Sequence, residues 1–490
     1  MAENRQSAQR PTEPTTGAGA LFGPRAIVCL VLLTVALLGV GNGLTGLVQK
    51  WAQGRFGIAV DRPRAWPFSV FSVRVPTWHE VVIAAAVVVV FYIARRQLAR
   101  IGFRPGWVVL AGLALIIGTN LMQGWQNGFV TPTAGTIGEW KARLRDPLKT
   151  AAHLSAAERN ARLQYYDDAI GVENGWRFLQ EYNELQPDLR THSQTHPPGA
   201  VLVFHWLRSL VGEPAAISLA IAVVSTALSG LFLYGLWRTL NVEGRLAGYM
   251  SFVFLVLPAV QIYYAASLDA LIATALLGGL YCFVQGRGAV AVAGTTVLVI
   301  AASFLTFGWV FILPVLAGWE IVQRRSIWRF AVVCAGVGAF YLALYGASGF
   351  DYVGSLRLAS TIENPQGFRL LAEPVSYVLT RLECIVEILV FLGPFLAALV
   401  WRGLRLAEEV DRAMRLLFWL GVGALLAMFA AGAFRTGETA RACLFIYPYL
   451  LLPIGAYMRR PVVSDRGRMQ LLGLVFGQTV LMQVFGSYFW

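Results

Sequence analysis

The sequence predicts an all-α membrane protein that crosses the bilayer many times and carries a large loop on its outer face. Hydrophobic residues make up 57% of the 490 residues and charged residues only 14%, a balance that a water-soluble globule with one core cannot bury. Apolar runs of about 17–25 residues, long enough to cross about 30 Å of hydrocarbon, recur along almost the whole chain. A polar stretch at residues 126–199 interrupts these runs.

About thirteen apolar runs qualify as transmembrane helices. Three of them form an N-terminal unit at residues 23–124, and ten form a membrane domain at residues 215–490. Before them, residues 1–22 are polar and rich in Pro, Ser, Thr and Gly, which predicts a disordered cytoplasmic tail. The expected spans are residues 26–47, 80–97, 106–124, 215–237, 246–264, 270–286, 289–305, 308–323, 329–346, 380–401, 415–433, 442–458 and 468–488.

The formal charge of +13 is explained by topology and not by a nucleic-acid partner. Arginines gather in alternate short loops between the expected helices, for example at residues 95–104, 324–329 and 459–468. Under the positive-inside rule these loops and the N-terminal tail are cytoplasmic, where they can also meet anionic membrane lipid. The loop at residues 125–214 and those near 347–379 and 434–441 then lie outside. One outer loop fits less well, because residues 50–77 hold Arg55, Arg62, Arg64 and Arg74.

Basic-residue usage indicates a bacterial source. The chain has only three lysines, Lys50, Lys141 and Lys149, beside thirty-seven arginines, a coding bias of GC-rich genomes. We therefore expect a multi-pass protein of the bacterial cytoplasmic membrane, with its N-terminus in the cytoplasm. All five cysteines fall inside the expected spans and are interpreted as small packing residues.

The outer loop at residues 125–214 holds the main candidates for chemistry. Asp167 and Asp168 are adjacent and follow Tyr166, and either carboxylate could act as a general base or orient a sugar hydroxyl. A solvated surface patch or a helix cap explains this pair equally well. The loop is too large for a bare connection, so we expect it to form a small ordered cap.

His192 and His196 lie in the same loop, four residues apart. That spacing could bind a metal on a helix, but the Pro197-Pro198 pair that follows disfavours a helix through His196. Contact with a phosphate or a sugar is therefore favoured over zinc. The apolar segment at residues 200–211 is too short to cross the bilayer and is expected to lie along the outer interface.

Asp269 stands at the outer end of an expected helix, next to a span that would favour no charge. An acidic residue at the edge of hydrocarbon costs free energy and is usually kept for a function. The alternative is an aspartate that caps the helix just outside the membrane.

A short outer turn near residue 438 adds three charged residues, Arg435, Glu438 and Arg441. The planar guanidinium of an arginine suits a lipid phosphate because it gives paired, charge-assisted hydrogen bonds, and Glu438 could hold one arginine in place. The alternative is a structural ion pair between Glu438 and Arg441.

Together these residues resemble the GT-C superfamily of polyprenyl-phosphate-dependent glycosyltransferases, in particular the protein mannosyltransferase and aminoarabinose transferase type. The resemblance rests on acidic residues in a large outer loop, the His-Pro-Pro segment that closes it, an outer aspartate and a late Glu-x-x-Arg turn, and it covers residues 126–448. It implies an inverting transfer of a sugar from a polyprenyl phosphate on the outer face.

By position, the resemblance assigns the catalytic carboxylate to Asp167 or Asp168, the Pro-Pro position to His196 and the second acidic residue to Asp269. Two features depart from the family pattern. Two extra helices precede the large loop, and the usual Asp-Glu pair is Asp-Asp here, which leaves Glu139 as a competing base.

The sequence thus predicts a glycosyltransferase whose donor is a polyprenyl-phosphate sugar and whose acceptor is a glycan, a lipid or a protein. No nucleotide is required, and a divalent cation stays possible although no ligand set has convincing spacing. Two alternatives from other classes remain: a membrane transporter or lipid-linked oligosaccharide flippase, and a non-catalytic subunit of an envelope-glycan assembly.

Overall fold

The computed structural model describes residues 19–56, 72–134, 165–286, 288–365, 367–405, 412–433 and 438–488. These parts of the chain are almost entirely helical, apart from the pairing of β1 (Ser72–Val73) with β2 (Gly486–Ser487). Six of the described helices are long and apolar enough to cross a membrane, or up to eight if each of two bent pairs is one span. The all-α class and the membrane-embedded character are confirmed at this level, and the thirteen spans stay a prediction.

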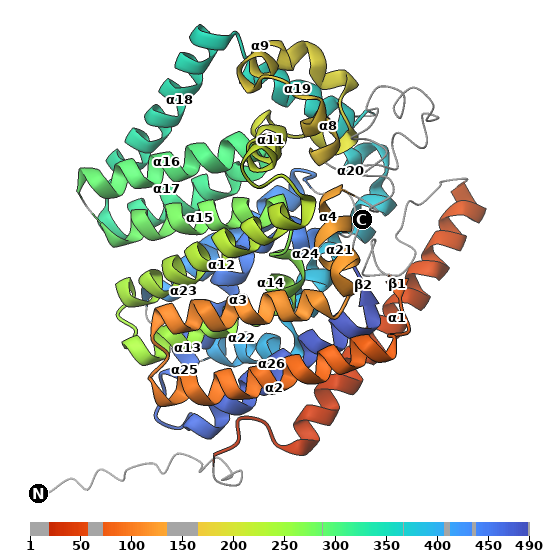
Figure 1. The fold of residues 1–490 in the computed structure, drawn as a ribbon, viewed down its shortest axis with the longest axis vertical. Coiled ribbons are helices and arrows are strands. Elements are labelled where there is room, and N and C mark those ends of the chain that lie inside the picture. Colours follow the sequence, from red (N-terminus) through yellow and green to blue (C-terminus); the bar gives the residue numbers. More distant parts are fainter. Residues whose placement is uncertain are drawn as a thin grey trace, which may run out of the picture.

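Six expected spans coincide with long straight helices (Figure 1). Each helix begins within three residues of the start of its expected span. The six are α1 (Pro24–Phe56), α2 (Trp78–Arg100), α12 (Pro214–Thr239), α15 (Leu268–Gln285), α18 (Trp328–Ser348) and α23 (Arg412–Ala430).

Two other expected spans are bent. The helix α3 (Pro105–Leu121) turns by 119° into η1 (Gln126–Val130) and α4 (Thr131–Ala134). The helices α21 (Pro374–Leu392) and α22 (Pro394–Arg405) meet at 99°. Gly393 between them has a φ of +99°, and Pro394 lacks the N–H that would continue α21, so this dipeptide ends one helix and starts the next.

The remaining expected spans are shorter or interrupted, apart from α26, which is a continuous helix of 21 residues. Pro258 ends the run that begins with α13 and starts a separate short helix, because proline is favoured at the first position of a helix. The elements are α13 (Gly244–Leu255), α14 (Pro258–Tyr263), α16 (Ala289–Leu305), η3 (Phe307–Phe311), α17 (Ile312–Arg324), η4 (Leu444–Ile446), α25 (Tyr447–Met458) and α26 (Asp465–Phe485).

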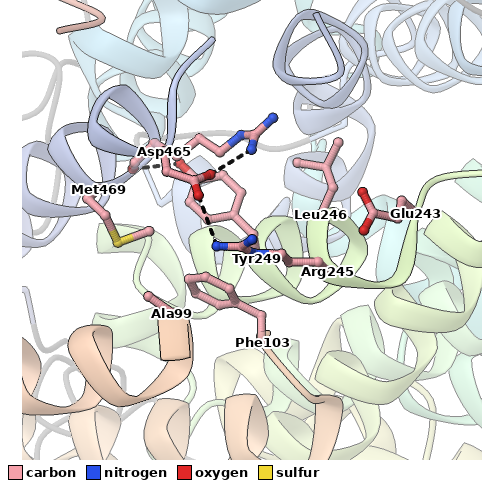
Figure 2. A pocket seen from close by; sticks show the side chains of 9 residues that line it. Ala99, Phe103, Glu243, Arg245, Leu246, Tyr249, Asp465 and Met469 are labelled. Carbon is pink, nitrogen blue, oxygen red and sulfur yellow. Dashed lines mark hydrogen bonds and ion pairs between the residues drawn. The ribbon is translucent and has the colours of Figure 1, made fainter. Parts of the chain in front are cut away.

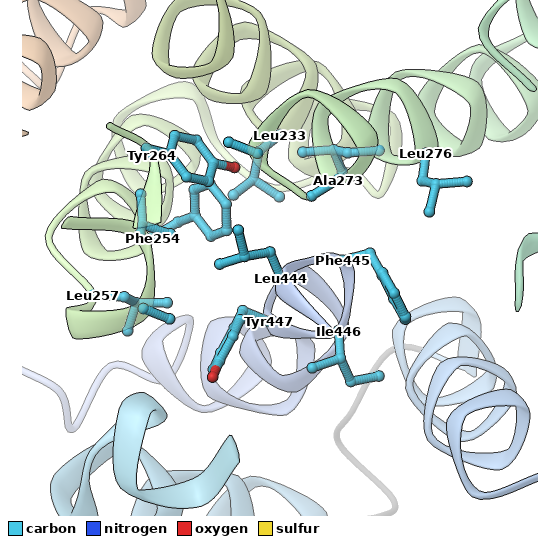
Figure 3. Packing of buried hydrophobic residues seen from close by; sticks show 14 of the residues in the cluster. Leu233, Phe254, Leu257, Tyr264, Ala273, Leu276, Leu444, Phe445, Ile446 and Tyr447 are labelled. Carbon is cyan, nitrogen blue, oxygen red and sulfur yellow. The ribbon is translucent and has the colours of Figure 1, made fainter. Parts of the chain in front are cut away.

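A dense apolar core lies where η4 meets α12, α13 and α15 (Figure 3). Leu444 points toward Phe254 and Tyr264, and these three side chains are nearly inaccessible to solvent. Burial of this apolar area anchors residues 444–447 to the helices around them. The preceding turn at residues 438–442 is therefore held against the start of α15.

A small cap lies at one end of the molecule, above α15 and α16 in the view of Figure 1. It consists of α8 (Tyr165–Gly171), α9 (Gly175–Leu185), η2 (Gln186–Asp188), α10 (Thr191–Gln194) and α11 (Gly199–Val211). Asn183 on α9 exchanges two hydrogen bonds of 2.8 Å with the backbone of Asp351, which starts α19 (Tyr352–Glu363). The described residues 165–211 form these helices, residues 135–164 of the expected loop lie outside the described residues, and the outer location of the loop stays a prediction.

Arg74, an apparent exception to the charge pattern of the loops, has a structural explanation. Its side chain pairs with Glu80 at 3.0 Å and donates hydrogen bonds to the carbonyl oxygens of Val484 and Met122. These bonds satisfy carbonyl groups near helix ends and fasten β1 beside β2. We refer to Arg74, the two strands and their partners as the terminal clasp.

Candidate functional site

Arg441 is the centre of a buried charged cluster formed by two distant parts of the sequence. It lies on the short helix α24 (Thr439–Ala442), and its Nε lies 3.4 Å from Oδ2 of Asp269 at the start of α15. Arg441 also forms an ion pair with Glu438. The hydroxyl of Ser267 donates a hydrogen bond of 3.2 Å to the Asp269 carboxylate, which fixes its orientation.

Glu387 holds the turn that carries Arg441, a role that the sequence did not reveal. This residue of α21 is 1% exposed, and its carboxylate accepts hydrogen bonds from the backbone N–H groups of Thr439 and Ala440, at 3.3 and 3.2 Å. The sequence showed only a charge within an apolar span. Its position therefore gave no sign of which segment it would contact.

Two further buried arginines lie in the first half of α21 and just before it. Arg381 donates hydrogen bonds to the carbonyl oxygens of Phe429 and Ala433, and its guanidinium lies 5.2 Å from the ring centre of Tyr377. Arg369, on α20 (Arg369–Ala372), lies 3.7 Å from the carboxylate of Glu373. Sequence reasoning did not single out either arginine as a site residue.

The cap contributes Tyr165 and two histidines to the cluster. The Tyr165 hydroxyl lies 3.1 Å from Nε2 and 3.3 Å from Nδ1 of His196. The ring of Tyr165 stacks against Phe204 and lies beside His192. The α10 helix ends at Gln194, as expected from Pro197, so His192 and His196 do not share one helix.

The electrostatics of the cluster connect the cap with Arg441. Burial lowers the pKa of His192 to about 3, and the nearby Arg441 adds to this effect. Burial also lowers the pKa of His196, although the carboxylate of Asp269 opposes the shift. Burial and Asp269 together raise the pKa of Tyr165 well above its usual value. At neutral pH both histidines are therefore uncharged, and Tyr165 keeps its proton.

Asp168 bonds within the cap. Its Oδ2 accepts a hydrogen bond of 3.0 Å from the backbone N–H of Arg190, just before α10. Burial raises the pKa of its carboxyl group, and the hydrogen bond to Arg190 opposes that shift. This geometry fits the helix-capping interpretation of the Asp-Asp pair and also holds the segment that carries His192 and His196.

The other sequence-based candidates are placed as follows. Asp167 has a buried Oδ2 atom, and Tyr166 is 1% exposed within the hydrophobic core. The tyrosine that contacts both histidines in the cluster is Tyr165. Glu139 and Arg435 lie outside the described residues. Within the described ranges, no three or more His, Cys, Asp or Glu side chains are grouped to hold a metal ion.

A separate small hollow of about 80 Å³ lies among α2, α13 and α26, away from the cap (Figures 1 and 2). Its floor is apolar and includes Phe103 and Tyr249, and Asp465 at its rim binds Arg245 and Arg468 at 2.9 Å each. Asp465, Arg245 and Arg468 partly neutralise one another, so their network mainly joins α13 to α26.

The chain matches no protein-family model, no curated protein and no solved structure. A function is therefore inferred from the residues that the fold brings together around Arg441.

Proposed function

We propose that this protein is a membrane glycosyltransferase of the GT-C type, which moves a sugar from a polyprenyl phosphate to an acceptor hydroxyl. The main support is the convergence of Arg441, Asp269 and Glu438 with Tyr165, His192 and His196 of the cap. The donor's chain requires lipid and its phosphate requires a cation. Its reacting carbon must lie at the water boundary, which suits a cluster between apolar helices and a polar cap.

The charges of the cluster suit glycosyl transfer. Such reactions develop positive charge on the anomeric carbon, which the carboxylates of Asp269 and Glu438 can stabilise. Arg441 can neutralise the departing phosphate through charge-assisted hydrogen bonds, and Arg435 is a sequence-based candidate for the same role. A divalent cation could assist there as well.

The proposed reaction inverts the anomeric centre. The acceptor oxygen, from a glycan, a lipid or a protein, forms a bond to the anomeric carbon as the carbon–oxygen bond to the phosphate breaks. Polyprenyl phosphate leaves with the bonding electrons, and the acceptor's proton passes to a base on the cap. Asp167 and Asp168 are the sequence-based candidates for that base. We place the reaction on the outer face of the bacterial cytoplasmic membrane, within a thirteen-span topology.

A transporter or flippase of lipid-linked sugars is the second candidate. It is favoured by the interrupted helices, since bent pairs such as α21 and α22 commonly line transport sites in membrane proteins. A non-catalytic assembly subunit is a third.

Purified protein in nanodiscs, supplied with a radiolabelled polyprenyl-phosphate sugar, separates these functions. We expect transfer of the sugar to an acceptor, or its slow release to water, and a loss of about 100-fold or more in Arg441→Gln. Arg177→Gln on the cap is the control, because Arg177 is exposed and forms its ion pair with a neighbouring glutamate on its own helix.

Intact donor that crosses a proteoliposome bilayer without reacting would support the transporter instead. If the wild-type protein neither transfers nor releases the sugar across a panel of donors, the glycosyltransferase proposal fails.

A further inference from the structure

The hydrogen bonds of His196 define which of its ring nitrogens carries a proton. Nδ1 lies 2.9 Å from the carbonyl oxygen of His192. A carbonyl oxygen can only accept a hydrogen bond, so Nδ1 must be the donor. In the neutral ring, the lone pair therefore lies on Nε2.

Tyr165 completes this arrangement. Its hydroxyl lies 3.1 Å from Nε2 of His196, and the proton of Nδ1 is already directed at His192. The Tyr165 hydroxyl must therefore donate to Nε2. Its oxygen keeps lone pairs that can accept another hydrogen bond.

The surrounding rings hold Tyr165 in place. Phe204 lies parallel to its ring within 13°, with the ring centres 5.9 Å apart, and the ring of His192 lies 5.8 Å away. On the His196 side, the hydroxyl of Tyr182 donates hydrogen bonds to the backbone oxygens of Ser193 and His196. The pair thus has a fixed geometry before any substrate arrives.

This tautomer does not suit contact between His196 and a phosphate. Phosphate oxygens accept hydrogen bonds, whereas the available nitrogen of neutral His196 is itself an acceptor. The same property suits the removal of a proton. Asp168, by contrast, already binds the backbone of Arg190 through Oδ2.

We propose that Tyr165 and His196 are the proton acceptor of this site, in place of the Asp167 and Asp168 carboxylates. The proposal rests on the glycosyltransferase function proposed above. As the acceptor oxygen bonds to the anomeric carbon, its proton passes to the Tyr165 oxygen, and the Tyr165 proton passes to Nε2 of His196. The phosphate leaves with the electron pair of the broken bond, and the proton on His196 then returns to solvent.

The groups that face His196 are consistent with this role. Asp269 on α15 stabilises the imidazolium that forms, whereas Arg441 on α24 opposes it. On the cap, the neighbours are Tyr165 on α8 and the neutral His192 on α10. The Asp269 carboxylate thus favours protonated His196, and Arg441 favours the later release of that proton.

Steady-state kinetics with the labelled donor tests the assignment. We expect His196→Gln and Tyr165→Phe each to lower kcat by about 10²–10⁴-fold, with little change in KM. Both variants should also lose the acid-side fall of the pH–kcat profile. His79→Gln is the matched control, because His79 is exposed at the start of α2. If these variants keep the wild-type kcat and profile while Asp167→Asn or Asp168→Asn abolishes transfer, a carboxylate is the base and the assignment is overturned.

A measurement without turnover separates this assignment from the proposed function. The chain has only five histidines, so ¹⁵N-histidine labelling gives few NMR signals to assign. We expect His196 to be protonated on Nδ1, and its Nε2 resonance to shift in Tyr165→Phe. A proton on Nε2 would overturn the assignment even in an active enzyme. If His196 carries its proton on Nδ1 but the protein transfers no sugar, the glycosyltransferase function is disproved. The hydrogen bond between Tyr165 and His196 would still stand.

Discussion

Arg441 connects two segments that lie far apart in the sequence, the start of α15 and the turn before α25. It is 9% exposed and contacts the carboxylates of both Asp269 and Glu438. When one partner of a buried ion pair is removed, the charge left behind is no longer compensated. This costs more free energy than the intact pair contributes. The charges around Arg441 are therefore coupled in their effect on stability.

The first prediction follows from this coupling. Arg441→Gln should lower the free energy of unfolding by about 3 kcal/mol, because two partly buried carboxylates lose their counter-charge. Adding Asp269→Asn should recover part of that loss, so the double variant is less destabilised than the sum of the singles. Denaturation of the variants in detergent measures the cycle. Strict additivity would contradict a direct interaction between the two side chains.

The second prediction concerns pH. The pKa values of His192 and His196 lie below 6.5 in the folded protein, so the unfolded chain binds more protons as the pH falls. Their contribution to stability is complete above pH 6.5 and declines as the pH falls, by up to about 1.4 kcal/mol per pH unit and group, and the decline from His192 continues toward about pH 3. The raised pKa of Asp168 acts in the opposite direction, since its folded form keeps a proton more readily.

Thermal melting between pH 7.5 and 5 measures this dependence. We expect the melting temperature of the wild-type protein to fall over this range and the fall to be smaller in His192→Gln. An equal fall in that variant would show that His192 is not buried in its neutral form.

The charged part of the site could be foreseen from the sequence, but its aromatic part could not. Asp269 and the turn with Glu438 and Arg441 stand out because charges are rare beside apolar spans. Tyr165 gives no such signal, since a tyrosine beside carboxylates is as common in a core as in a site. Glu387 was visible as a charge, but its hydrogen bonds to α24 depend on tertiary contacts alone.

At the scale of secondary structure, apolar length predicted where the straight helices start, but it could not predict bends. A run of hydrophobic residues looks the same whether it continues or turns, and the break between α13 and α14 falls inside one such run at Pro258. The junction of α21 and α22 depends on Gly393 and Pro394. These residues are compatible with either a kinked span or two helices.

The close packing of the cap against α16 depends on a glycine at the start of α11. A Cβ atom on Gly199 would lie 2.2 Å from the backbone oxygen of Phe304, at the end of α16. Gly199→Ala should therefore push the cap away from α16 and expose it to limited proteolysis. Gly171→Ala is the control, because a Cβ atom there meets nothing within 4 Å. Equal protease resistance of the two variants would contradict this close contact.

On the scale of the whole molecule, the arrangement of loops can be tested directly. The arginine distribution predicts that the turn after α17 is cytoplasmic and that α19 lies outside. A membrane-impermeant maleimide applied to intact cells should label Ser360→Cys and leave Ser326→Cys unlabelled, with the wild-type protein as the blank. The opposite pattern would reverse the orientation and place the cap and Arg441 in the cytoplasm.

The terminal clasp has a consequence for how the protein is made. Arg74 binds Val484, 410 residues later, and Gln123 binds Gln483 and Gly486, about as far away. The bonds of Arg74 to Glu80 and Met122 can form early, but the Nε group of Arg74 and the side-chain amide of Gln123 lack their later partners until α26 has left the ribosome. The clasp thus closes only after α26 has been made, and a nascent chain stalled before α26 should need a chaperone or the translocon to shield those groups.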